Sequence, residues 1–168
     1  MKITLLLALL LSPFLTQAQN AGYSAAKAQC DRVNTFNASE DCYFGIKGKT
    51  FFDSAALSQC ERCNTNNALA YCVGNIGDKR YENARSALAQ CERVNTNDDL
   101  AFCVAGIGGF SFDSKAIAQC ERITTNHELA SCLVGIRGKT YTSEEISECE
   151  RWTTNADLAA CLRRRGTL

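Results

Sequence analysis

The sequence predicts an all-α solenoid of five short α/α-hairpin repeats, each about 30 residues long and each stapled by a disulfide. Of the 11 cysteines in the 168-residue chain, all but Cys63 fall into five pairs with one common spacing. The text around the pairs also repeats, as in QCERVNTNDDLAFCVAGIGGF and QCERITTNHELASCLVGIRGKTY. Helix-favouring residues are abundant, and the single proline lies near the N-terminus. The repeats cover approximately residues 23–48, 52–78, 82–109, 112–138 and 142–165.

The first 18 residues predict a secretory signal peptide of bacterial type. Lys2 precedes an apolar run, and small residues around Ala18 match a cleavage site. The run is too short to span a bilayer, which takes about 20 residues, and no cysteine at the cleavage site offers a lipid anchor. We therefore expect residues 1–18 to be removed and residues 19–168 to form one domain. This domain is expected to be secreted or periplasmic and to have no membrane anchor.

The first helix of each repeat is predicted to end just after the first cysteine of its pair. Apolar residues lie three positions before and after this cysteine, as in Leu88, Cys91 and Val94, which places them on one helix face. Residues that cap exposed backbone N–H groups mark the helix starts. The predicted capping residues are Asp53, Ser54, Asp113, Ser114, Thr142 and Ser143.

The second helix of each repeat is predicted to begin after an Asn-Thr or Thr-Thr pair. A threonine and an acidic residue three positions later have the spacing of a capping box: Thr96 and Asp99, Thr125 and Glu128, Thr154 and Asp157. A glycine in the left-handed conformation is expected to end the helix, at Gly48, Gly77, Gly108 or Gly109, and Gly138. An aromatic residue is then expected to wedge between successive hairpins, at Phe51, Tyr81, Phe112 and Tyr141.

The two cysteines of each pair are predicted to face one another across the hairpin. The spacing within pairs is fixed whereas the spacing between pairs varies, which favours pairing inside each hairpin. The predicted bridges are Cys30–Cys42, Cys60–Cys72, Cys91–Cys103, Cys120–Cys132 and Cys149–Cys161. Each bridge closes a loop of about 13 residues and contributes about 3 kcal/mol in the chain-entropy model. So many bridges are typical of an exported chain.

Cys63 forms a C-x-x-C motif with Cys60, a spacing that also occurs in thiol-redox sites. It lies three residues after the first cysteine of its unit, a position that is apolar in the other units. Those residues are Val33, Val94, Ile123 and Trp152. We therefore interpret Cys63 as a buried free thiol. The alternatives are an intermolecular disulfide, a redox-active thiol, and a zinc site with Cys60 and Cys72 that lacks a fourth ligand.

Several polar positions recur in every unit. Glu-Arg follows the first cysteine in four units, and Asp31-Arg32 follows it in the first. We interpret these positions, and the glutamine that precedes the cysteine, as parts of the scaffold: the arginine reaches carbonyls at the hairpin turn and the acid pairs with a neighbour. A binding ridge is the alternative. His127 is interpreted as exposed and incidental, and the arginines at 163–165 as a soluble end cap.

Composition and motifs favour a binding protein over an enzyme. The 18 basic and 18 acidic residues balance, so no global field favours nucleic acid or anionic lipid as partners. No hydrolase, metalloprotease, haem or P-loop motif occurs, and we expect no cofactor and no metal. We expect a non-catalytic scaffold that binds a protein, a peptide or a cell-envelope polymer. The alternative is an extracytoplasmic enzyme, such as a thiol-redox factor that uses Cys63.

Exposed residues that differ between units are candidate binding contacts, because a scaffold role would recur in every copy. These candidates are Lys79, Arg80, Lys115, His127, Arg137 and Lys139. The stapled repeat also resembles the cysteine-rich α/α-repeat proteins that some bacteria secrete, which stack hairpins and join each with a disulfide. The repeat here is shorter and its cysteines lie further apart. The resemblance implies a secreted binding surface and carries over no functional residue.

Overall fold

The structure is a computed structural model that describes residues 21–168, so the predicted signal peptide lies outside the described residues. A helix over residues 21–30 comes first. The elements that follow are α2 (Phe36–Ile46), α3 (Ser54–Cys60), α4 (Asn66–Ile76), η1 (Glu82–Ala84), α5 (Arg85–Cys91), α6 (Asn97–Ile107), α7 (Ser114–Cys120), α8 (Asn126–Ile136), α9 (Ser143–Glu150) and α10 (Asn155–Arg164). The predicted all-α repeat fold is confirmed. Extended pairing within residues 21–168 is limited to one isolated bridge, between Thr140 and Thr167.

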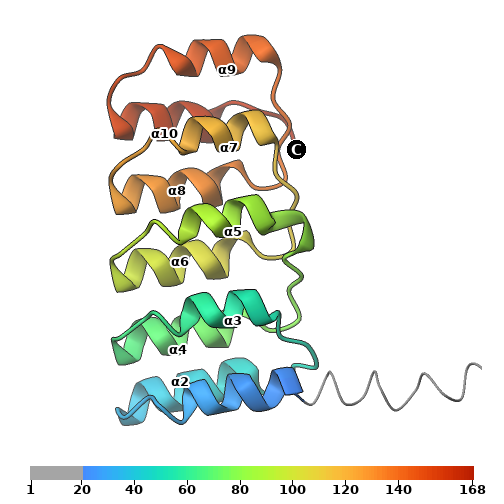
Figure 1. Cartoon of the computed structure of the whole chain (residues 1–168), viewed down its shortest axis with the longest axis vertical. Coiled ribbons are helices and arrows are strands. Elements are labelled where there is room, and N and C mark those ends of the chain that lie inside the picture. Colours follow the sequence, from blue (N-terminus) through green and yellow to red (C-terminus); the bar gives the residue numbers. More distant parts are fainter. Residues whose placement is uncertain (1–20) are drawn as a thin grey trace, which may run out of the picture.

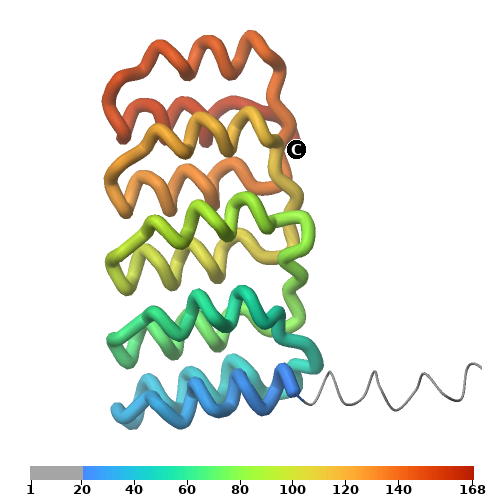
Figure 2. Tube along the Cα trace, viewed as in Figure 1, coloured from blue at the N-terminus to red at the C-terminus, as the bar shows by residue number. Residues whose placement is uncertain are grey.

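The helices lie in two layers (Figure 1). The first helix of each hairpin lies in one layer, formed by residues 21–30, α3, α5, α7 and α9. The second helices, α2, α4, α6, α8 and α10, form the other layer. The hairpin turns follow one edge of the stack, and the connections between hairpins follow the opposite edge (Figure 2). The second helices pack against one another more extensively than the first helices do, so their layer is the tighter side of the stack.

The predicted apolar faces of the helices are buried between the two layers. In the third hairpin, Leu88 and Cys91 of α5, Val94 of the hairpin turn and Cys103 of α6 are all buried. Trp152 occupies the same position as Val94 but is 49% exposed, because it lies on the terminal unit of the stack. The core is thus continuous along the stack and opens only at its ends.

The disulfides join the predicted cysteine pairs, one in each hairpin. Each links residues 12 apart in sequence, with Cα atoms 5.5 to 5.9 Å from one another. The bridged cysteines are buried, apart from the partly buried Cys161 in the last unit. Because helices this short are marginal in water on their own, the bridges contribute to holding each hairpin together.

Side-chain caps begin the first helices where the sequence predicts them. Asp53 accepts hydrogen bonds from two backbone N–H groups at the start of α3, and Asp113 does the same for α7. Thr142 and Glu145 form a capping box at the start of α9. These caps satisfy donors that a helix N-terminus otherwise leaves without partners.

None of the capping boxes predicted for the second helices forms completely. The Thr154 hydroxyl accepts from the Asp157 N–H at 3.1 Å, which is half of such a box. The Thr96 hydroxyl instead donates to the Asp99 carboxylate at 2.6 Å and caps no backbone group, and Thr125 behaves in the same way. Donation to the carboxylate does not by itself prevent capping, because the Thr154 hydroxyl donates to the Asp157 carboxylate and still accepts from the Asp157 N–H.

The second helices end in the left-handed conformation as predicted, except in the second unit. Gly48, Gly109 and Gly138 have φ angles of 75°, 87° and 69°. In the second unit this conformation falls on Asp78, with φ of 59°, while Gly77 has φ of −59°. Aspartate is one of the few residues that adopt this conformation at modest cost, because its short side chain bonds locally.

Asp78 also joins two successive connections. Its carboxylate accepts from the backbone N–H groups of Thr50 at 2.9 Å and Phe51 at 3.1 Å, and its own N–H donates to the Phe51 carbonyl at 2.8 Å. The hydrogen bond from the Thr50 N–H is the main cause of a pKa for Asp78 below its ordinary value of 3.8. Gly109 and Gly138 donate through their backbone N–H groups to the preceding connections in the same way.

The aromatic residues at the connections close the ends of their own hairpins. Tyr81 and Tyr141 are buried, and each donates at 2.8 Å to a backbone carbonyl in the second helix of its own unit. This contrasts with the predicted wedge between successive hairpins. In the second unit the buried aromatic is Phe52, whereas the predicted Phe51 is partly exposed and lies under the guanidinium of Arg80.

A ladder of polar side chains joins the first helices. Gln90 accepts from Arg93 at 3.0 Å and donates to Glu121 of the next unit at 2.9 Å. The same pattern begins at Gln29, Gln59 and Gln119. Arg93 also donates to the Ile123 carbonyl in the next turn at 3.1 Å. These bonds hold successive hairpins in register, which agrees with the scaffold interpretation of the recurring residues.

A second ladder joins the hairpin turns. Asn126, the first residue of α8, accepts from the Asn95 N–H at 3.1 Å and donates to the Asn95 side chain at 2.6 Å. Corresponding bonds are made by Asn66, Asn97 and Asn155. At the same position α2 has Phe36, which is 75% exposed. The first unit therefore lacks the asparagine with which the other units cap the turn before them.

Candidate functional site

Cys63 lies in the core of the second hairpin and is the one free cysteine of the described residues. Its side chain is fully buried, with Sγ 3.8 Å from the Asn97 carbonyl oxygen. Burial raises the pKa of the thiol to about 11, so little thiolate exists near neutral pH. Cys60, the other cysteine of the C-x-x-C motif, is bonded to Cys72. This environment suits an apolar structural position.

The six polar surface candidates do not meet in one site, and most of them bond within the stack. Three donate to backbone carbonyls: Lys79 to Ala105, Arg137 to Gly106, and Lys139 to Arg163 and Arg165. The others contact neighbouring side chains: Arg80 pairs with Glu82, Lys115 donates to Ser143, and the His127 ring bonds to Asp99. Much of their bonding capacity is therefore used inside the fold.

An apolar hollow of about 700 Å³ crosses α2, α4 and α6 on the layer of second helices. One exposed aromatic side chain from each helix borders it, and the exposed fractions are 80% for Phe44, 49% for Tyr71 and 39% for Phe102. We call this surface the aromatic groove and define it by Phe44, Tyr71, Phe102, Asp41, Asp98 and Gly74. Its volume falls in the range typical of ligand sites.

The groove forms because its central helix carries small residues. The residue two positions after the second cysteine is Phe44 in α2 but Gly74 in α4. A Cβ atom added to Gly45 would overlap the backbone of Gly74, so α2 and α4 pack backbone against backbone there. This close approach lowers the floor of the groove, and Tyr71 and Phe102 border it from α4 and α6.

The aromatic groove carries negative charge. Asp41 of α2 and Asp98 of α6 line it on the two sides of α4, and no lysine, arginine or histidine is among the lining residues. Within residues 21–168, neither carboxylate forms an ion pair. Asp53 differs, because it is paired with Arg85 at 3.1 Å.

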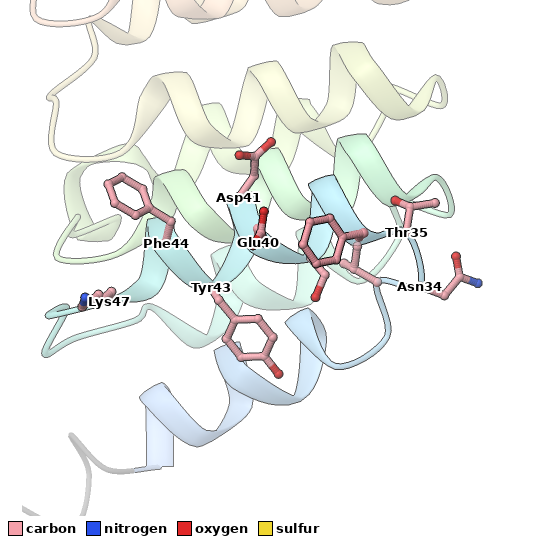
Figure 3. A pocket seen from close by; sticks show the side chains of 10 residues that line it. Asn34, Thr35, Glu40, Asp41, Tyr43, Phe44 and Lys47 are labelled. Carbon is pink, nitrogen blue, oxygen red and sulfur yellow. The ribbon is translucent and has the colours of Figure 1, made fainter.

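A second hollow, of about 910 Å³, lies along α2 at the N-terminal end of the stack (Figure 3). Tyr43 points from α2 toward the first helix, where its hydroxyl bonds to Asp31. Asp41 and Phe44 project away from Tyr43 in Figure 3, and both line this hollow and the aromatic groove. Phe44 and the exposed Phe36 extend the apolar surface to the end of the stack.

Sequence reasoning did not identify the aromatic groove. One signal for it is present in the sequence, because the residue before the second cysteine varies strongly between units. The residues at that position are Asp41, Tyr71, Phe102, Ser131 and Ala160. Two successive units have an aromatic residue at this position, where the other units have a small or polar one, which indicates a role local to those two units. The close packing of α2 and α4 that turns them into a groove is visible only in three dimensions.

Three further observations concern metal sites, membrane spans and disulfides in the described part of the chain. No group of three or more histidine, cysteine or acidic residues in it is placed to hold a metal ion. No helix of residues 21–168 has both the length and the apolar character needed to cross a membrane. The disulfides are typical of folding in an oxidising compartment outside the cytoplasm. In comparisons with known proteins, no family model, curated protein or solved structure matches the chain.

Proposed function

We propose that the protein is an exported, non-catalytic binding module whose aromatic groove holds a partner. The observation that carries the proposal is the exposure of Phe44, Tyr71 and Phe102 around one hollow, on the second helices of three successive hairpins. Aromatic side chains bury large areas at interfaces, and they are among the residues that contribute most to binding. Exposing three of them side by side is costly for a soluble domain and is typical of an interaction surface.

The rigidity of the stack supports binding as well. Five disulfides and two side-chain ladders fix the hairpins relative to one another. A groove that is already formed loses little conformational entropy when a partner enters, which strengthens binding without adding contacts. The polar residues that recur in every unit act in the ladders, so the variable groove residues are left to determine what is bound.

The composition of the groove favours binding over catalysis. Its lining contains alanine, glycine, asparagine, aspartate, phenylalanine and tyrosine, and it includes no serine, cysteine, histidine or lysine. Serine, cysteine, histidine and lysine are common catalytic nucleophiles, and among the lining residues only aspartate and tyrosine could take that role. Asp41 comes from α2 and Asp98 from α6, so α4 lies between the two helices that carry these carboxylates. Export through the predicted signal peptide of residues 1–18 belongs to the same proposal.

Site-specific photocrosslinking in the exporting cell tests the proposed function. A benzophenone amino acid replaces Tyr71 or Phe102 in the groove, and Phe110 serves as the control. Phe110 is 40% exposed and lies in the connection after α6, under Arg137. We expect a defined covalent adduct from both groove positions and none from Phe110. Adducts from Phe110 alone, or the same adducts from all three positions, would contradict a groove-specific partner.

A further inference from the structure

We propose that the aromatic groove binds an extended peptide that carries lysine or arginine next to apolar side chains, an inference that rests on the proposed function. The first argument is charge. Asp41 and Asp98 line the groove without a cationic partner within residues 21–168, and the lining supplies no positive charge. Most other exposed carboxylates in the stack are engaged, as Glu121 is by Gln90. A cationic partner therefore meets two carboxylates in the groove that form no ion pair in the described chain.

The second argument is that a lysine or arginine side chain of a partner could contact an aromatic ring and a carboxylate of the groove at the same time. The long stems of lysine and arginine cover apolar surface while their charged ends reach a carboxylate or lie over a ring. The protein already uses this contact elsewhere. The Arg137 guanidinium carbon lies 4.9 Å from the ring centre of Phe110, and that of Arg80 lies 5.5 Å from the ring centre of Phe51.

The third argument is the supply of hydrogen bonds for a peptide main chain. Asn67, in the first turn of α4, and Asn75, in its last turn, line the groove. The Asn75 side chain donates to the Tyr71 carbonyl at 2.7 Å, a bond that uses one of its two N–H donors and neither lone pair of its amide oxygen. The Asn67 amide forms no hydrogen bond with other residues of the described chain. Side-chain amides offer both donors and acceptors, as the N–H and C=O groups of a peptide require.

The dimensions of the groove suit a short extended segment. It crosses three neighbouring helices, and packed helices lie about 8–10 Å apart, so its length is roughly 20 Å. An extended chain rises about 3.3 Å per residue, which gives room for roughly six residues. A nucleic acid would place its phosphates against Asp41 and Asp98. A neutral polysaccharide would stack on the rings but leave both carboxylates without a counter-charge.

The test is selection from a display library of random eight-residue peptides against the full exported chain. Affinities of the enriched peptides are then measured by fluorescence anisotropy. The charge variant is Asp41→Asn with Asp98→Asn, and its control is Glu144→Gln, an exposed carboxylate on α9. The aromatic variant is Tyr71→Ser, and its control is Phe110→Ser. A neutral glucan oligosaccharide and soluble peptidoglycan fragments are measured in parallel as competing partner classes.

We expect the enriched peptides to combine lysine or arginine with apolar residues. Their affinity is expected to fall about 30-fold with Tyr71→Ser and about tenfold with the charge variant, and to stay within about twofold with either control. Enriched peptides that are acidic or uncharged, or that bind the charge variant as tightly as the wild-type protein, would overturn the inference. If these peptides still lose affinity with Tyr71→Ser, the groove remains the binding site. Preferential binding of the glucan or the peptidoglycan fragments would overturn it in the same way. An affinity that Tyr71→Ser leaves unchanged would contradict the proposed function itself.

Discussion

Cys63 belongs to a sequence motif that is typical of reactive thiols, but in the structure its side chain occupies a buried core position. The slot it fills carries valine in the first and third units, and the thiol is fully buried there. Burial raises the pKa of the thiol to about 11, so the reactive thiolate is about 100-fold scarcer than for a thiol with the ordinary value of 9.0. The C-x-x-C motif arises where this slot follows the structural cysteine Cys60.

Replacing Cys63 by valine is therefore expected to leave the fold intact. The change is close to isosteric, and we expect the free energy of unfolding to change by less than about 1.5 kcal/mol. Urea denaturation of the oxidised protein measures this change. Val94→Ala, in the equivalent slot of the third unit, is a matched control that removes buried methyl groups and should cost more. A larger loss for Cys63→Val than for the control would contradict the structural role.

Asp78 provides a pH-dependent contribution to stability. Hydrogen bonds from the Thr50 and Phe51 N–H groups favour its charged form, so its pKa in the folded protein lies below 3.8. A lowered pKa stabilises the fold above the unfolded value, and this contribution disappears as pH falls through the folded value. We expect Asp78→Asn, which tolerates the left-handed backbone, to lower the melting temperature more at pH 7 than at pH 2.5. An equal effect at both pH values would contradict this role.

At the scale of the elements, the hairpin is the unit of stability. Each hairpin consists of two helices too short to be stable alone, one disulfide, and contacts with the hairpins on either side. In such repeats, stability is approximately the sum of the units and their interfaces. A central hairpin has two interfaces, whereas a terminal hairpin has one and frays more easily.

Removing a disulfide should therefore have different consequences at the centre and at the end. Replacing Cys91 and Cys103 by alanine is expected to cost about 3 kcal/mol in global stability. The same change at Cys149 and Cys161 is expected to loosen α9 and α10 while the other hairpins stay protected. Hydrogen–deuterium exchange resolved by hairpin measures both effects. Uniform loss of protection across all hairpins in the terminal variant would contradict a stack of semi-independent units.

The sequence was sufficient to predict the hairpins but not the groove. The cysteine spacing and the capping residues Asp53 and Asp113 are local signals, and they correctly predicted the helices and the disulfide pairs. The left-handed residue was misplaced at Gly77 because an aspartate can adopt this conformation when its carboxylate finds backbone donors. The groove depends on residues about 30 positions apart in sequence, such as Phe44 and Gly74. Their positions relative to one another are set by the packing of α2 against α4.

At the scale of the whole molecule, the two end units break the ladders that join the others. Glu148 occupies the position of the ladder glutamines and pairs with Arg165 at 2.7 Å. In the first unit, Asp31 takes the place of the ladder glutamate, and Phe36 takes the place of the asparagine that caps the preceding turn. If two copies stacked end to end, Glu148 of one copy would take the place of the glutamine that donates to the acidic residue of the next unit. Two carboxylates, Glu148 and Asp31, would then face one another, and like charges repel.

We therefore expect the wild-type protein to remain monomeric in light scattering at neutral pH. The triple variant Asp31→Glu, Phe36→Asn and Glu148→Gln restores the ladder residues at both ends. It is expected to associate in a concentration-dependent way. If the wild-type protein associates and the variant stays monomeric, the assignment of these residues as end caps is contradicted.

The aromatic groove depends on the register of α2, α4 and α6, which a non-reducing peptide map of the mature protein tests most directly. Free thiols are alkylated in the native state before digestion. We expect one bridge within each hairpin, from Cys30–Cys42 to Cys149–Cys161, and no label on Cys63 until the protein is denatured. A bridge between hairpins, a Cys60–Cys63 disulfide, or immediate labelling of Cys63 would contradict the stapled stack and remove the basis for the groove.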